Sequence, residues 1–137
     1  MCRSSLRGFF IALTGALCSV AAAADFEPAG VLLCAVQEVR SCMPYNKCEA
    51  TPPEPVGIPD FIRIEFDQKK ISDMMNGGGD KTIAIERQKL TRSEIYLQGH
   101  EGYAWTLSIA RKNGRFNLTT SETDYTFVVF GSCTLPE

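Results

Sequence analysis

The chain is short of the residues that most hydrolytic enzymes depend on: its 137 residues include one histidine and one tryptophan. An activated serine, threonine or cysteine nucleophile usually has a histidine beside it as its base. The single histidine, His100, falls in the segment Gly99 to Gly102, where a solvated turn is expected. The sequence therefore provides no nucleophilic catalytic set, and we predict no catalytic residue of this kind.

An excess of basic residues is also lacking. The chain has 14 Lys and Arg against 16 Asp and Glu, a formal net charge of −2. Nucleic acids and anionic membranes are bound by clustered basic residues. We therefore expect neither nucleic acid nor an anionic membrane surface as a partner.

Long apolar runs are missing apart from one near the start, from Phe9 to Val20. It is shorter than the roughly 20 residues that cross a bilayer. Arg3 and Arg7 precede it and three alanines, ending at Ala24, follow it, which is the pattern of a cleaved signal peptide. We predict a signal peptide over residues 1–24, an exported (periplasmic or extracellular) domain over residues 25–137, and no stable membrane anchor after cleavage.

The cysteines lack the paired close spacing of a zinc ribbon, so no metal site is expected. Four of the six remain after cleavage, and an even number in a small exported domain indicates disulfides. Three pairings are possible, and the sequence alone does not choose among them. We favour Cys42 with Cys48, closing a short loop, and Cys34 with Cys133, joining the first strand to the last.

A sustained helical period is absent, and apolar residues instead alternate with polar ones in short segments separated by turn residues. This pattern predicts an all-β antiparallel meander, closed as an up-and-down barrel or a strongly curled sheet, with a two-sheet sandwich as the alternative. The residues from Arg40 to Pro59 include five prolines and are expected to form a long connecting loop. The expected strands are Val31–Val39, Phe61–Asp67, Lys81–Gln88, Glu94–Gln98, Tyr103–Ala110, a strand containing Phe116, Leu118 and Thr120, and Tyr125–Phe130.

Turns are expected where glycine and asparagine gather. Lys112 to Gly114 predicts a tight hairpin turn, and Asn76 to Asp80 a glycine-rich one. The stretch from Gln68 to Met75 is compatible with a helical turn or with a continued strand.

Trp105 lies in the expected strand that also contributes Leu107 and Ile109 to one face, and Phe116 comes from the next strand. In a solidly packed barrel these four side chains would be core. In a roomier barrel they would line a pocket for a small apolar ligand.

Acidic residues provide the one alternative for catalysis. Glu65 and Asp67 share a strand face, and Asp60 lies at the start of the same strand. Paired carboxylates hydrolyse glycosides, but the solvent face of any strand has the same pattern. No cofactor is indicated.

Three segments resemble a group of small exported bacterial β-domain proteins that end in a similar apolar-Gly-x-Cys-Thr strand. These segments read IPDFIRIEFD at 58–67, YLQGHEGYAWTLSIARKNGR at 96–115 and FVVFGSCT at 127–134. The resemblance implies a periplasmic β domain and no particular activity. More loosely, the chain is similar to the periplasmic lysozyme inhibitors, although it lacks their Ser-Gly-x-Arg-Tyr loop, so no inhibitory residue is carried over.

Together these observations favour a non-catalytic binding or interaction module. Its partner would be a protein or a small apolar ligand, and a carboxylate-based hydrolase is the less supported alternative. The sequence identifies neither the partner nor the oligomeric state.

Overall fold

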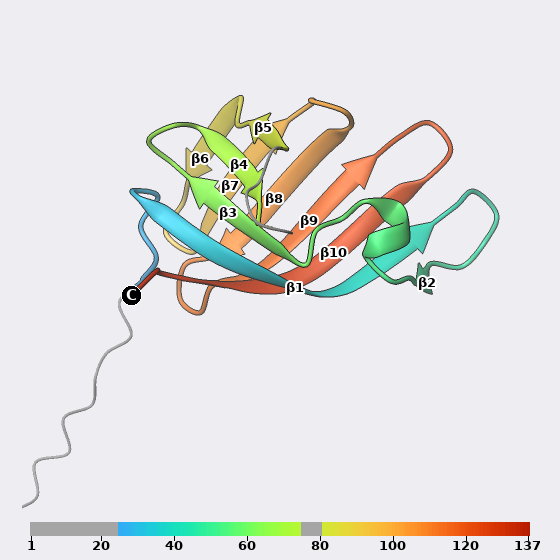
Figure 1. Cartoon of the computed structure of the whole chain (residues 1–137), viewed down its shortest axis with the longest axis horizontal. Coiled ribbons are helices and arrows are strands. Elements are labelled where there is room, and N and C mark those ends of the chain that lie inside the picture. Colours follow the sequence, from blue (N-terminus) through green and yellow to red (C-terminus); the bar gives the residue numbers. More distant parts are fainter. Residues whose placement is uncertain (1–24, 75–80) are drawn as a thin grey trace, which may run out of the picture.

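A computed structural model describes residues 25–74 and 81–137, so the predicted signal peptide and the predicted turn at 76–80 lie outside the described residues. Within them the fold is all-β, with one short 3-10 helix, η1 (Glu54–Val56), and one antiparallel sheet (Figure 1). The strands are β1 (Val31–Cys42), β2 (Glu49–Ala50), β3 (Phe61–Glu65), β4 (Lys70–Asp73), β5 (Thr82–Ala84), β6 (Arg87–Leu90), β7 (Glu94–Gly99), β8 (Ala104–Ala110), β9 (Arg115–Ser121) and β10 (Thr126–Thr134).

The first and last long strands pair with each other at the middle of the sheet. The order is β5-β4-β3-β1-β10-β9-β8-β7-β6, with β2 attached to the far half of β1. Cys34 of β1 lies directly opposite Cys133 of β10. The sheet is a single layer that curls strongly on itself, so the expectation of a curled meander is confirmed and the two-sheet alternative is wrong.

The two outermost strands of this order are consecutive in the chain. β5 pairs with β4, and β6, which begins three residues after β5 ends, pairs with β7 at the opposite end of the sheet. Between them Ile85 N–H donates to Lys69 O at 2.8 Å and Glu86 N–H to Gln98 O at 2.9 Å. One bent segment thus joins both edges of the curled sheet, where a single strand over Lys81–Gln88 was predicted.

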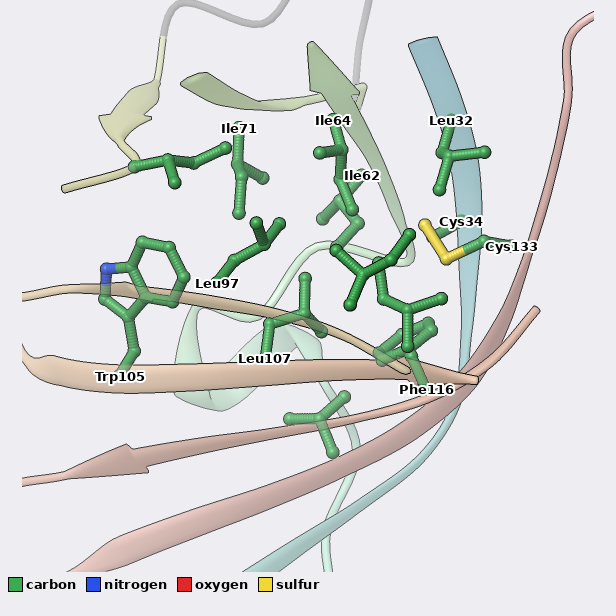
Figure 2. Packing of buried hydrophobic residues seen from close by; sticks show 14 of the residues in the cluster. Leu32, Cys34, Ile62, Ile64, Ile71, Leu97, Trp105, Leu107, Phe116 and Cys133 are labelled. Atoms are coloured by element: carbon green, nitrogen blue, oxygen red, sulfur yellow. A yellow bond between two sulfur atoms is a disulfide. The ribbon is translucent and has the colours of Figure 1, made fainter. Parts of the chain in front are cut away.

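The concave face of the sheet holds the core because side chains alternate along each strand. Leu32, Ile64, Ile95, Leu107 and Val129 are fully buried there. Figure 2 shows the cluster extending from Trp105 at one end to the Cys34–Cys133 bridge at the other. Alternation therefore identified the inward-facing residues of β3 and β8, whereas in β1 a bulge between Val36 and Glu38 shifts the alternation, so that Leu32 and Cys34 are buried before it and Val39 after it.

Both favoured disulfides are present: Cys34 with Cys133, 99 residues apart, and Cys42 with Cys48, six residues apart. The first disulfide links β1 to β10, the two strands at the middle of the sheet. The second closes the hairpin between β1 and β2, whose tip exposes Met43 and Tyr45.

Two further segments differ from the prediction. The stretch 68–75 contains β4, which forms a hairpin with β3, because Ile71 supplies one more apolar side chain to the buried face opposite Ile64. The proline-rich stretch 40–59 is not loop throughout: β1 continues to Cys42, and β2 and η1 follow. Backbone pairing to β1 is possible at Glu49 and Ala50 because the prolines lie on either side of them.

Candidate functional site

An apolar cavity of about 530 Å³ lies within the curl of the sheet. Its walls come from the concave face and from the end of the proline-rich segment. The apolar side chains that line it are Val36, Val56, Ile58, Pro59, Ile62, Ile71, Ile83, Trp105, Leu107, Phe116, Leu118 and Phe127.

The end of the proline-rich segment forms one wall of the cavity. Hydrogen bonds within the segment hold its backbone in place. Gly57 N–H donates to Glu54 O at 3.1 Å and Ile58 N–H to Pro53 O at 3.1 Å. Gly57 has φ of +69°, a conformation that glycine adopts at little cost. This turn brings Val56 and Ile58 against the core.

Three of the four predicted pocket residues line the cavity: Trp105, Leu107 and Phe116. Ile109 does not line it. Ile109 is fully buried and pairs across the sheet with Ile95 and Phe116, in the part of the core that is packed. The cavity thus occupies only part of the interior.

Sequence reasoning missed the walls contributed by β3, β4 and the proline-rich segment. Ile62 had the alternation of an inward-facing residue, whereas Ile71 lay in a stretch compatible with a helical turn or a continued strand. Which part of the interior each side chain faces depends on the curl of the sheet. Val56 and Ile58 carried one signal, two β-branched apolar residues within a stretch otherwise rich in proline.

Trp105 is 5% exposed and its indole lies against Gly99 of the neighbouring strand. A Cβ at Gly99 would lie 2.6 Å from Trp105 Cζ2 and 2.8 Å from the carbonyl oxygen of Ala84. Glycine is therefore required there for the ring to fit. Among the described residues the buried indole Nε1 has no hydrogen-bond partner.

Apart from Gly57, the exposed residues of the cavity lining lie in or next to β5 and in the loop after β7, and they mark its mouth: Lys81, Thr82, Glu101, Gly102 and Tyr103. Glu101 Oε2 accepts a hydrogen bond from Ala84 N–H at 3.0 Å, which fixes the loop after β7 against β5. Ser72, Asp73 and Thr120 lie just inside, half-buried. The mouth is thus polar and the walls apolar.

Tyr125 stands close to the mouth, in contact with Phe127 of the wall at 5.2 Å between ring centroids. A hydrogen bond to Glu122 raises the pKa of Tyr125 to about 12, with burial, the charge of Glu122 and the neighbouring Tyr103 acting in the same direction. The phenol is therefore a neutral donor to Glu122 at neutral pH.

The acidic residues considered for hydrolysis do not gather in the cavity. Glu65 is bound by Arg63 at 3.2 Å and Lys70 at 3.5 Å, and Asp67 is exposed in the turn after β3. Asp60 lines a separate groove beside β2. His100 pairs with Glu86 on the surface. None of the four lines the cavity.

The described residues contain no group of three or more His, Cys, Asp or Glu side chains arranged to hold a metal ion. Nor does this part of the chain include a helix long and apolar enough to span a membrane.

By its fold and its cavity, the protein is a small, disulfide-bonded domain in which a curled β-sheet encloses an apolar cavity. No protein-family profile, curated protein or solved structure matches the chain.

Proposed function

We propose that this protein is an exported, non-catalytic binding domain that holds a small apolar ligand within its curled sheet. The observation that carries the proposal is the cavity. Its volume of about 530 Å³ falls within the range of roughly 300 to 1,000 Å³ of small-molecule sites. Like those sites, it combines apolar walls with a few polar groups, here at one mouth.

Export is part of the proposal. The two disulfides suggest an oxidising, non-cytoplasmic environment. The basic, apolar and alanine pattern of residues 1–24 supports delivery there as a cleaved precursor.

The only tryptophan of the chain lies in the wall, so binding has an intrinsic reporter. Titration with the neutral probe N-phenyl-1-naphthylamine should quench Trp105 emission and raise probe emission in a saturable manner. Absence of any saturable change would contradict the proposal.

Filling the cavity provides the matched test. Val56→Phe adds a ring to a half-buried wall residue on the proline-rich segment, where the empty volume can accept it. We expect it to weaken probe binding at least tenfold while destabilising the fold by less than the roughly 1 to 3 kcal/mol typical of overpacking. Val128→Phe is the control. It makes the same change on the face of β10 that points away from the cavity, and it should leave probe binding unaltered.

A protein partner is the second candidate, and the tip of the β1–β2 hairpin is what favours it. Tyr45 is fully exposed, with φ of +67°, a costly conformation for an aromatic residue, inside the loop closed by Cys42 and Cys48. Rigid exposed tyrosines are common anchors in protein interfaces. A partner retained from periplasmic extract by the wild type and lost with Tyr45→Ala would support this function, and identical retention would contradict it.

A further inference from the structure

We propose that the cavity selects a neutral amphiphile, with an apolar body and an uncharged oxygen-bearing end such as an alcohol, over the anion or cation of the same chain length. This inference rests on the proposed function, because it specifies the ligand class for that same site. It comes from the distribution of charge along the lining.

The inner walls carry no charged side chain. Charged residues of the lining are limited to Asp73, Lys81 and Glu101, of which Lys81 and Glu101 are exposed at the mouth and Asp73 is half-buried just inside. An ionised group moved into the apolar part would lose its hydration without a counter-charge. A ligand must therefore place its polar end at the mouth and its apolar body against Ile71, Trp105 and Leu107.

The mouth is unfavourable to an anion. Its three charged residues have a formal charge of −1, and Glu122 lies beyond Tyr103 and Tyr125. A ligand carboxylate held there would face more negative than positive charge, at separations where Coulomb interactions still matter.

A cation gains less from the negative charge of the mouth than it loses in hydration. Glu101 already accepts a hydrogen bond from Ala84 N–H and Glu122 accepts one from the hydroxyl of Tyr125, so both carboxylates are partly compensated. The ammonium group of Lys81 would in addition repel a second cation. The net charge of the mouth therefore offsets only part of the desolvation cost of a cationic end.

Two neutral hydroxyl-bearing side chains also belong to the lining: Tyr103 at the mouth, and Thr120, which pairs with Trp105 on the inward face. Hydroxyls donate to and accept from an alcohol, ester or amide without demanding a charge. These groups can therefore form hydrogen bonds with an uncharged polar end of a ligand.

Decan-1-ol, decanoate and decyltrimethylammonium share one alkyl chain and differ in the charge of the head. Each is titrated at pH 7.4 against wild-type protein loaded with N-phenyl-1-naphthylamine, decanol below its solubility limit and the two ions below their critical micelle concentrations. We expect decanol to displace the probe at a concentration at least about tenfold lower than either ion, consistent with the cost of desolvating a charged end. Equal or tighter binding of either ion would overturn the inference.

Glu101→Gln tests the electrostatic cause. The glutamine oxygen can still accept from Ala84 N–H, but the negative charge is lost. The affinity for decanoate should rise several-fold relative to the affinity for decanol. Glu49→Gln, on β2 and outside the cavity lining, is the matched control and should change neither. An unchanged ratio of decanoate to decanol affinity in Glu101→Gln would refute the assigned role of charge.

The two proposals fail in different ways. If the wild type does not bind N-phenyl-1-naphthylamine, the proposed function fails. If it binds the probe but decanol does not displace it, or an ion displaces it as well as decanol does, the cavity remains a binding site and only the inference about ligand class is wrong.

Discussion

At the scale of single residues, Trp105 combines burial, contact with the cavity and an unsatisfied donor. Its ring is 5% exposed and its Nε1 has no partner in the described part of the chain. A buried donor without a partner costs about 1 to 3 kcal/mol. The residue therefore stabilises the fold through its apolar contacts and not through its N–H group.

Two substitutions separate these contributions. Trp105→Ala should reduce the free energy of unfolding by about 3 to 5 kcal/mol, because a large aromatic is lost beside an existing cavity. Trp105→Phe should cost much less, because it keeps an aromatic ring and removes the unsatisfied N–H. Urea unfolding followed by circular dichroism measures both, and equal losses would contradict the expectation that an aromatic ring without the N–H group retains most of the stability.

Tyr125 makes a prediction at alkaline pH. Its folded-state pKa of about 12 lies above the ordinary value of 10.0, so between these values the unfolded chain loses a proton that the folded chain retains. The stabilisation is complete below pH 10 and is lost as the pH rises towards 12. The hydrogen bond to Glu94 also raises the pKa of Tyr96 and contributes in the same direction.

Unfolding measured from pH 9 to pH 12 should show a shallower alkaline loss of stability in Tyr125→Phe than in the wild type. Tyr45→Phe, at a fully exposed tyrosine, is the control and should follow the wild-type curve. Superimposable curves for wild type and Tyr125→Phe would contradict the role of the Glu122 hydrogen bond.

At the scale of elements, the two disulfides constrain very different lengths of chain, with sequence separations of 99 and 6 residues. In the chain-entropy treatment, a closed loop of about 100 residues contributes roughly 4.7 kcal/mol, against roughly 3 for a loop of about 15. The Cys34–Cys133 bridge also lies in the core, whereas the other closes a surface hairpin.

Replacing Cys34 and Cys133 together by alanine should therefore lower the melting temperature more than replacing Cys42 and Cys48. Thermal unfolding by circular dichroism gives the ranking, and thiol titration of the wild-type domain should find no free cysteine. The reverse ranking would mean that strain in the core bridge cancels its entropic benefit.

At the scale of the whole molecule, the predicted export signal fixes the expected start of the mature protein, because the basic, apolar and alanine pattern of residues 1–24 places cleavage after Ala24. We expect the protein isolated from the periplasm to start at Asp25. Intact-mass measurement decides this. Retention of Met1, or added acyl mass on Cys18, would contradict cleavage at this position.

The sequence by itself determined the local features of this protein. Alternation of apolar and polar residues identified Ile62, Ile64, Leu107 and Ile109 as inward-facing, and Gly114, with φ of +68°, occupies the hairpin turn predicted from its neighbours. Cysteine parity predicted disulfides. These features follow from periodicity and backbone freedom within a few residues, which a linear pattern records directly.

Only the tertiary structure decided where the interior is hollow. Trp105 and Ile109 have the same alternation on the same strand, yet one lines the cavity and the other lies in the packed core. The difference depends on how far the sheet curls, on the segment that joins β5 to β6, and on the placement of Val56 and Ile58 against the opening. These contacts join residues distant in the chain, and their packing sets a volume that no local period encodes.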